Sequence, residues 1–250
     1  MLRINRLIVR NYLHIDSLTI APGQLVAVCG PNGSGKSTLL EALSGYLPPY
    51  SGSIQLDGKE LTDYSVAELA SVRSWLAQQQ PHRASISIAQ QLAWVIEPYR
   101  HLAPAQQVVD EVIHDLSLSS ILHRPLLQLS GGELQRAYLA SLLVASDRRL
   151  NPAHQLVLLD EPLTALDPRY QHQVIEKLLA LQAQGQTILI SLHDLNIAMF
   201  YAMDVLLLSQ GRLTICGAAR DVLTQERISE LFGVSMTQIR INGRNQLVLS

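Results

Sequence analysis

The sequence predicts an α/β fold in which a helical segment is inserted into a mixed sheet. Three short apolar runs, at 25–29, 156–160 and 187–191, are typical of parallel strands that are covered on both faces. Between the first two runs, from about 79 to 150, strand-like alternation fades and helical periodicity dominates. This order favours one α/β core interrupted by a helical lobe over two separate domains.

Size and composition agree with a single domain. At 250 residues, of which 48% are hydrophobic, the chain can bury a full α/β core without disulfides or a metal ion. We expect one domain over 1–250, with a catalytic α/β core at 1–78 and 151–250 and a helical subdomain at 79–150.

The first part of the chain predicts strands followed by a helix. β-Branched and aliphatic residues alternate within 2–10 and 18–29, which predicts strands there. A glycine-rich loop then leads into an apolar-periodic helix over about 36–44. The order is therefore strand, loop, helix.

The rest of the chain alternates between the two periodicities. In the middle, helical patterns cover 88–96, 105–117 and 131–145. A further helix is expected at 168–184, between two buried strands, which is a βαβ arrangement. Towards the end, short strands are expected at 205–208, 212–216, 237–241 and 246–249, with two small helices after 218.

Charge and composition exclude several classes of protein. The formal charge of −2, from 19 basic and 21 acidic residues, gives no reason to expect nucleic-acid binding. Charged or polar residues interrupt every apolar stretch short of the roughly 20 residues that a membrane-spanning helix needs. No leader pattern opens the sequence, so a cytoplasmic location is expected. Cys29 and Cys216 lack metal-ligand spacing and are interpreted as reduced core thiols.

A phosphate-binding loop follows the strand at 25–29. The segment from Gly30 to Ser37 fits G-x-x-x-x-G-K-[ST] in full, between a predicted strand and a predicted helix. Its glycines allow backbone N–H groups to surround a phosphate, Lys36 supplies a positive charge, and the Ser37 hydroxyl is a ligand suited to Mg²⁺. The alternative is a glycine turn that happens to carry a lysine. The candidate nucleotide-binding residues here are Gly30, Pro31, Asn32, Gly33, Ser34, Gly35, Lys36, Ser37 and Thr38.

An acidic pair ends the apolar run at 156–160. Asp160 and Glu161 lie where ligands gather in an open α/β sheet, at the carboxyl end of a strand. Asp160 is expected to reach the metal ion, and Glu161, facing the other way on an extended backbone, is the candidate general base for the attacking water. An acidic turn between strand and helix is the alternative. The phosphate loop makes the catalytic interpretation the better one.

A second candidate phosphate site opens the helix predicted at 131–145. Ser130, Gly131 and Gly132 leave free backbone N–H groups at a helix N-terminus, which suits an anion. A generic helix cap would have the same residues. The position of the motif, after a phosphate loop and before the acidic strand, favours a functional role.

In this order the motifs resemble those of the ABC transporter ATPase family, and the resemblance covers essentially the whole chain. It implies a P-loop NTPase core of the RecA-like type, ATP as the nucleotide and Mg²⁺ as the metal ion. Residues 30–37 resemble the Walker A loop, 156–160 with Glu161 the Walker B strand and catalytic glutamate, and 130–133 the signature motif.

The resemblance also assigns residues that patterns alone do not. Gln78 is similar to the Q-loop glutamine that contacts Mg²⁺ or water, although Gln79 or Gln80 is an alternative match. Asp167 resembles the D-loop aspartate that reaches a dimer interface, and His193 the switch histidine that holds the γ-phosphate and Glu161. The other seven histidines show no ligand spacing and are interpreted as surface residues.

Two positions depart from the family pattern. Glu133 stands where the family usually has glutamine, which puts the role of that side chain in doubt. Tyr12 is the candidate for the aromatic ring that stacks on adenine, with an ordinary core or surface tyrosine as the alternative.

The resemblance further implies partners and a location. In the family, the signature of one copy caps the ATP of the other, so a homodimer is expected. It would dock on two transmembrane permease subunits, at the cytoplasmic side of the inner membrane, with a periplasmic substrate-binding protein as an indirect partner. The segment 81–99, with Trp94 and Tyr99, is the candidate permease-facing surface; the alternative for Trp94 is the core of the helical lobe.

Within the family, several segments resemble the ATPases of vitamin B12 importers. They are the variant signature 129–133, the stretch 151–155 and the tail at 222–224, 232–234 and 241–243. Iron-siderophore and haem importer ATPases share the architecture and are the alternatives. A soluble ABC ATPase acting on nucleic acid is less well supported, because the chain has no tandem cassette and no basic insertion.

Overall fold

The computed structural model describes residues 1–78, 85–201, 203–241 and 243–250, and it confirms the predicted fold class. Within these ranges, ten strands form one mixed sheet in the order β5-β4-β1-β2-β10-β9-β3-β8-β7-β6. The strands of this sheet are β1 (Leu2–Val9), β2 (Leu13–Ile20), β3 (Leu25–Cys29), β4 (Ser51–Leu56), β5 (Lys59–Glu60), β6 (Arg73–Leu76), β7 (Leu156–Leu159), β8 (Thr187–Ser191), β9 (Asp204–Ser209) and β10 (Arg212–Ala218).

The parallel part of the sheet is the centre of the molecule. β3 pairs in parallel with both β8 and β9, and β7 pairs in parallel with β8 and β6. Every residue of β3, β7 and β8 is buried. This is why their sequences are continuous apolar runs and not alternating ones.

Alternate residues of these strands face two different cores. Val26 and Val28 of β3 pack with α1 (Lys36–Leu43), β1 and β2 on one face of the sheet. Ala27 and Cys29 of the same strand pack on the other face with α5 (Gly131–Ser146) and α6 (Pro168–Ala183). The sheet therefore lies between two hydrophobic layers, as the period of two along a strand requires.

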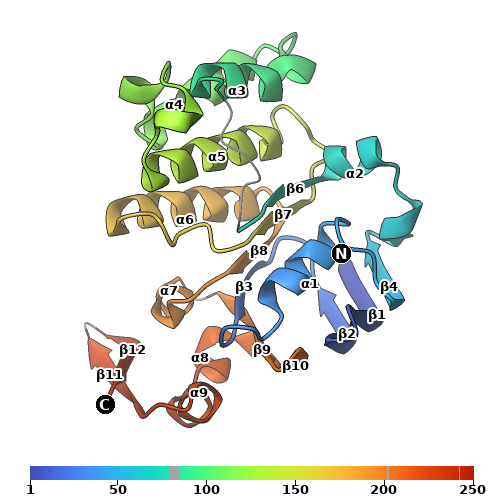
Figure 1. Ribbon diagram of the computed structural model, residues 1–250, viewed down its shortest axis with the longest axis vertical. Helices are drawn as coiled ribbons and strands as arrows, with labels where there is room; N and C mark the ends of the chain where they lie inside the picture. Colours follow the sequence, from blue (N-terminus) through green and yellow to red (C-terminus); the bar gives the residue numbers. More distant parts are fainter. Residues whose placement is uncertain (79–84, 202, 242) are drawn as a thin grey trace.

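The helices expected in the middle of the chain are present. α3 (Ile88–Ile96), α4 (Ala105–Asp115) and α5 stack above the sheet, with α6 of the core beneath α5 (Figure 1). Ser87 and Ser130 each cap a helix through a reciprocal capping box, which accounts for where α3 and α5 begin. Trp94 on α3 is 66% exposed, so the core alternative for this residue is wrong.

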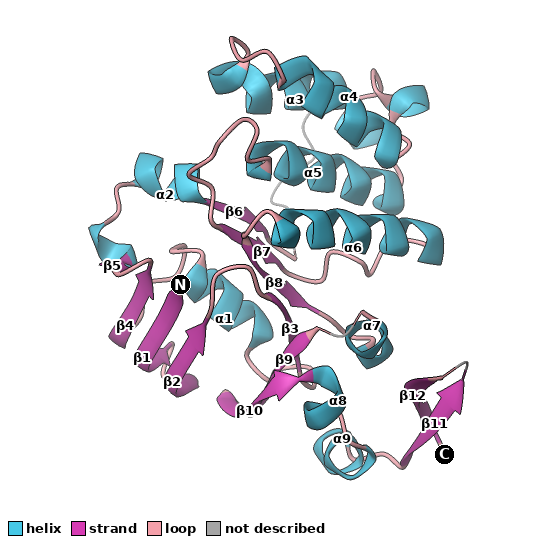
Figure 2. Cartoon of the chain, turned by 180° about the vertical axis from the view of Figure 1, so that it is seen from behind, coloured by secondary structure: helices cyan, strands magenta, loops and turns pink. Residues whose placement is uncertain are grey.

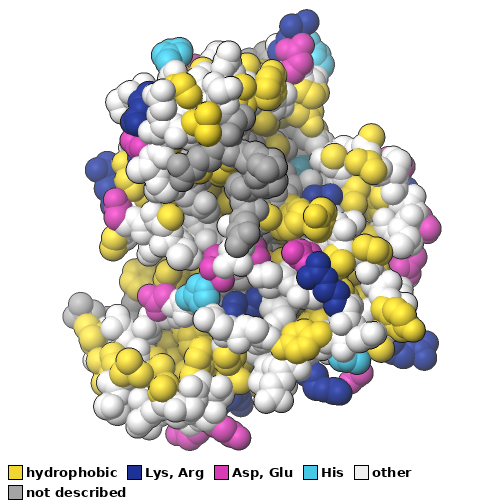
Figure 3. Space-filling model, in the orientation of Figure 1, with side chains coloured by type: hydrophobic (Ala, Val, Ile, Leu, Met, Phe, Trp, Pro, Cys, Tyr) yellow, Lys and Arg dark blue, Asp and Glu magenta, His cyan; other side chains and the backbone are white. Residues whose placement is uncertain are grey.

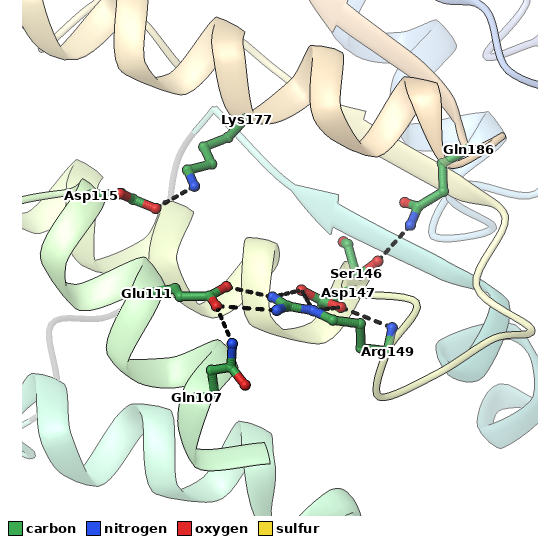
Figure 4. A network of polar contacts seen from close by, with 8 residues as sticks. All are labelled: Gln107, Glu111, Asp115, Ser146, Asp147, Arg149, Lys177 and Gln186. Atoms are coloured by element: carbon green, nitrogen blue, oxygen red, sulfur yellow. Dashed lines mark hydrogen bonds and ion pairs between the residues drawn. The ribbon is translucent and has the colours of Figure 1, made fainter. Parts of the chain in front are cut away.

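Polar contacts join the stacked helices to the core (Figure 4). Lys177 of α6 forms an ion pair with Asp115 of α4. Arg149, in the loop after α5, pairs with Glu111 of α4 at 2.6 Å and with Asp147 at 2.7 Å. Residues distant in sequence thus hold α4 against both α6 and the end of α5.

The C-terminal part lies beside the sheet and packs against the main hydrophobic core. Here α8 (Ala219–Val222) and α9 (Gln225–Phe232) precede a hairpin of β11 (Met236–Ile241) and β12 (Arg244–Leu249) (Figure 2). Figure 3 shows hydrophobic side chains gathered over this region. The exposed large apolar residues of this region and of the nearby α7 (Leu195–Phe200) are Phe200, Val234, Ile241 and Leu249.

Several features differ from the sequence expectations. The stretch from β4 to β6, with α2 (Val66–Val72), and the helix α7 were not predicted, and β2 begins at Leu13 and not at 18. Cys29 is buried but Cys216 is exposed, because it faces outwards from β10, so the core assignment of Cys216 is wrong. His154 is 1% exposed and not a surface residue. In the part of the chain that the structure describes, no helix combines the length and the apolar character required to cross a membrane.

Candidate nucleotide-binding site

The loop between β3 and α1 has the shape of a phosphate cradle. Gly30, Gly33 and Gly35 all have positive φ angles, of 150°, 75° and 104°. A Cβ atom on Gly30 would lie 2.2 Å from the carbonyl oxygen of Leu208, so a larger residue cannot occupy this position without moving the backbone. The hydroxyl of Ser34 is buried and has no hydrogen-bond partner among the described residues. The loop therefore offers an unused polar atom beside a backbone that only glycine permits.

Lys36, the first residue of α1, points back into this loop. Its Nζ atom donates hydrogen bonds to the carbonyl oxygens of Gly30 at 2.8 Å and Pro31 at 3.1 Å. Burial lowers the pKa of Lys36 from its ordinary value, and the charges of Glu161, Cys29 and Asp160 act in the opposite direction. A desolvated ammonium group bound only to neutral carbonyls is suited to receive an anion.

The acidic pair after β7 is organised by one hydroxyl that sequence reasoning missed. Ser191, the last residue of β8, donates a hydrogen bond from Oγ to Asp160 Oδ1 at 2.6 Å. The same Oγ accepts a hydrogen bond from the backbone N–H of Glu161 at 2.7 Å. The pairing of β7 with β8 would have pointed to this contact, because Ser191 ends the neighbouring strand.

Glu161 contacts His193 directly. Oε1 of Glu161 lies 2.6 Å from Nε2 of His193. The expected extended backbone at Glu161 is wrong, because its φ angle is +50°, in the left-handed region. This conformation turns the chain sharply after β7, and positive φ in a residue other than glycine is a form of strain that gathers at functional sites.

The phosphate loop, Glu161 and His193 line one cavity of about 520 Å³. In Figure 3, acidic, basic and histidine side chains gather in the middle of the face shown. The lining residues that were predicted are Tyr12, Asn32, Gly33, Ser34, Gly35, Lys36, Ser37, Thr38, Gln78, Glu161 and His193. Gly30, Pro31 and Asp160 lie directly beside them in sequence. The alternatives Gln79 and Gln80 lie outside the described residues.

The second phosphate-site motif lies outside this cavity. Ser130 caps α5, and Glu133 closes the capping box by accepting a hydrogen bond from the Ser130 N–H at 2.8 Å. That bond and the nearby Arg124 guanidinium hold the pKa of Glu133 below its ordinary value. The side chain of Glu133 thus has a structural partner on its own helix.

The two glycines of the motif have different surroundings. A Cβ atom on Gly132 would lie 2.9 Å from the carbonyl oxygen of Ala165, whereas one on Gly131 would meet nothing within 4 Å. Asp167, two residues after Ala165, caps α6 by accepting a hydrogen bond from the N–H of Tyr170. The start of α5 therefore packs against the segment that leads into α6, and Gly131 faces open space.

Tyr12 forms part of the cavity wall. Its hydroxyl donates a hydrogen bond to the carbonyl oxygen of Gly33, and the residue is 43% exposed. The ring therefore lies beside the phosphate loop and retains free surface, as a residue that stacks on a base would need.

The donor set fits Mg²⁺. Ser37 and Gln78 line the cavity and offer hydroxyl and amide oxygens, and the buried Asp160, next to Glu161, offers a carboxylate. These are the hard ligands that Mg²⁺ prefers. Among the described residues there is no group of three His, Cys, Asp or Glu side chains able to hold a metal ion. Mg²⁺ is usually bound by a few protein oxygens, and phosphates and water complete its coordination shell.

Comparison with known proteins agrees with the geometry. The model of the ABC transporter family matches residues 13–164. The chain belongs to the ABC transporter family. It is therefore an ATP-binding ATPase whose hydrolysis is coupled to transport.

Relatives with similar sequences span nearly the whole chain. The vitamin B12 import ATP-binding protein BtuD of Vibrio cholerae is 37% identical over 99% of both chains. The hemin import ATP-binding protein HmuV of Rhodopseudomonas palustris is 41% identical over 88% of this chain and 82% of its own. A solved ATP-binding subunit of an ABC transporter, 24% identical, superimposes with a TM-score of 0.78 over 94% of this chain and 95% of its own.

Proposed function

We propose that this chain is the ATP-hydrolysing subunit of an ABC importer and works as a homodimer docked on two permease subunits. The observation that carries the catalytic part is that one cavity is lined by the phosphate loop, Glu161 and His193, with the last two in contact at 2.6 Å. A nucleotide-binding loop, a base and a partner for that base are parts that hydrolysis of the terminal phosphoanhydride bond of ATP uses.

The roles of the residues follow from their chemistry. The N–H groups of the loop and the Lys36 ammonium bind the β- and γ-phosphates. Ser37, Gln78 and Asp160 hold Mg²⁺, which when bound neutralises developing charge on the phosphate oxygens. Glu161 accepts the proton of the attacking water, and His193 orients Glu161 and contacts the γ-phosphate. The two hydrogen bonds of Ser191 hold the Asp160 carboxylate and the Glu161 backbone in position.

A second copy completes the site. Ser130, Gly131 and Gly132 lie outside the cavity of their own chain, and Gly131 faces open space. Backbone N–H groups at a helix start suit phosphate, so these residues are proposed to close over the nucleotide of the partner. Asp167 follows Ala165 by two residues, and the carbonyl oxygen of Ala165 lies close to Gly132 of this motif. Asp167 is therefore proposed to reach the same interface. Two-fold symmetry makes two such sites from one sequence.

The proposed cargo is vitamin B12. Its support is the 37% identity to BtuD over 99% of both chains, together with the tail segments that resemble vitamin B12 importer ATPases. Haem is the second candidate, supported by the 41% identity to HmuV over a shorter match; iron-siderophores are a further alternative. A periplasmic substrate-binding protein, a position on the cytoplasmic side of the inner membrane and a permease contact through Trp94 belong to the same proposal.

The cargo is tested by uptake in cells that lack this chain. Labelled cobalamin and labelled haem are offered separately, and the parent chain or Glu161→Gln is returned on a plasmid. We expect the parent, and not Glu161→Gln, to restore cobalamin uptake. Restoration of haem uptake alone would reject vitamin B12 but keep the importer. Restoration of either by Glu161→Gln would reject ATP hydrolysis by Glu161 as the driving step.

A further inference from the structure

We propose that Asn196 is a positioning residue for the catalytic pair, through which the C-terminal hairpin holds His193 against Glu161. The inference rests on the proposed roles of these two residues. It concerns the hairpin of β11 and β12, which has no place in the nucleotide site itself.

Asn196 binds the hairpin as a neighbouring strand would. Its side-chain Oδ1 accepts a hydrogen bond from the N–H of Leu247 at 2.8 Å, and its Nδ2 donates one to the carbonyl oxygen of Leu247 at 3.1 Å. Leu247 is 5% exposed and belongs to the main hydrophobic core. The two bonds therefore join α7 to a point of the hairpin that is itself anchored.

The register of the hairpin explains why the backbone N–H and C=O groups of Leu247 can bond to Asn196. Leu247 lies opposite Gln238. In an antiparallel pair, every second pair of opposed residues turns its N–H and C=O groups away from the partner strand. Both residues of this pair have outward partners, because the N–H of Gln238 donates to Oε1 of Gln225 on α9 at 3.1 Å. The hairpin is thus held by one side-chain amide on each edge.

On the other side, Asn196 is tied to the histidine segment. Its backbone N–H donates to Oδ1 of Asp194, the cap of α7, at 2.9 Å. Asp194 follows His193 directly. The His193 side chain is 45% exposed and contacts Glu161 at 2.6 Å, so packing covers only part of its surface. Its position relative to Glu161 depends on where the backbone at the start of α7 lies.

The packing around α7 makes these bonds important. A cavity of about 230 Å³ lies beside α7, lined by His172 and Ile175 of α6, Asn196 and Ile197 of α7, and Asn245 and Gln246 of β12. α7 has only six residues and a cavity on this side, and the bonds from Asn196 to Leu247 are a direct polar connection from α7 to the hairpin. Losing them frees the start of α7 to shift.

The test compares two amide deletions on the same hairpin. Asn196→Ala removes the bonds from α7, and Gln225→Ala removes the matching bond from α9 and leaves α7 untouched. In the full-length chain with Mg·ATP, we expect Asn196→Ala to lower kcat about tenfold with KM within about twofold, since misplacing a catalytic group costs rate more than binding. Gln225→Ala should keep kcat within about twofold of the parent.

The outcomes separate this inference from the function on which it rests. Parental kcat in Asn196→Ala, or an equal fall in Gln225→Ala, would overturn the positioning role. If Asn196→Ala does not fold, Asn196→Asp keeps the acceptor for Leu247 and removes the donor; its kcat should also fall at unchanged KM, and parental kcat would overturn the inference. Glu161→Gln is measured alongside. If it keeps parental turnover, the proposed function fails; if it loses turnover while the Asn196 variants do not, only the inference fails.

Discussion

The Nζ atom of Lys36 donates a hydrogen bond to the carbonyl oxygen of Gly30, 2.8 Å away, at the start of its own loop. The ammonium group is buried and its pKa is lowered by desolvation. The charge is thus held beside the cradle by weak neutral acceptors that a triphosphate can replace. This relationship shows that the loop is organised around its cation.

Lys36→Ala should therefore bind ATP much more weakly than the parent. We expect the affinity for a fluorescent ATP analogue to fall by about 10- to 100-fold, as for the loss of a charged hydrogen bond worth about 1.5–3 kcal/mol. Lys59→Ala, which alters a lysine paired with Glu68 away from the cavity, is the matched control and should bind normally. Equal affinity of Lys36→Ala and the parent would remove Lys36 from the binding role.

Glu161→Gln should bind ATP but hydrolyse it slowly. The substitution keeps the shape of the side chain and the bond from its backbone N–H to Ser191, and it removes the proton acceptor. Turnover should fall by about 10²- to 10⁴-fold, the usual contribution of a general base, and the ATP-bound chain should accumulate as a dimer. Steady-state hydrolysis and light scattering measure both effects; turnover near that of the parent would rule out Glu161 as the base.

The two glycines at the start of α5 should respond differently to the same change. In Gly132→Ala the new Cβ would lie 2.9 Å from the backbone oxygen of Ala165, so the start of α5 or the segment before α6 must shift. Gly131→Ala meets nothing within 4 Å. We expect Gly132→Ala to lose about 1–3 kcal/mol of unfolding free energy, as overpacking does, and to hydrolyse ATP more slowly. Urea unfolding that ranks the two variants in the opposite order would contradict this packing.

Stability should fall in mild acid because of His154. Burial lowers the pKa of His154 from 6.5 to about 4, and its Nε2 atom lies 2.9 Å from the Ser74 hydroxyl. The unfolded chain takes up a proton below pH 6.5 that the folded chain resists until about pH 4, so stability is lost as pH falls through this window. The loss is at most roughly 3 kcal/mol.

Urea unfolding between pH 4 and pH 7.5 measures this loss. His154→Asn, which cannot take up the proton, should have a shallower slope across the same window. His123→Asn, which replaces an exposed histidine, should follow the parent. Identical slopes for the parent and His154→Asn would show that other groups cause the acid sensitivity.

Much of the site was predictable because its residues are adjacent in sequence or placed by strand ends. The geometry of loop 30–37 was predictable because its glycines and its lysine lie in one short continuous segment. Asp160 and His193 were predicted to follow two buried strands, and β7 and β8 are indeed neighbours in the sheet. Contact between Glu161 and His193 follows from that adjacency.

The features that sequence reasoning missed depend on tertiary contacts. Ser191 was only the end of an apolar run until the pairing of β7 and β8 placed its hydroxyl between Asp160 and Glu161. The left-handed backbone of Glu161 is unfavourable for glutamate, so no propensity indicates it. His154 looked like a surface histidine because burial of a polar ring requires a partner, Ser74, 80 residues earlier. Asn196 likewise reaches Leu247, 51 residues later.

The central claim, that each copy completes the other's nucleotide site, is tested most directly by crosslinking two different chains, each with one engineered cysteine in addition to the buried Cys29. Both carry Cys216→Ser to remove the exposed thiol and Glu161→Gln to retain ATP. One carries Asn32→Cys in the exposed part of the phosphate loop, and the other carries Gly131→Cys, where a side chain meets nothing within 4 Å. On mixing, ATP with Mg²⁺ should produce a disulfide between the two chains that is absent without nucleotide. ATP bound at full occupancy with no disulfide between the chains would contradict the account.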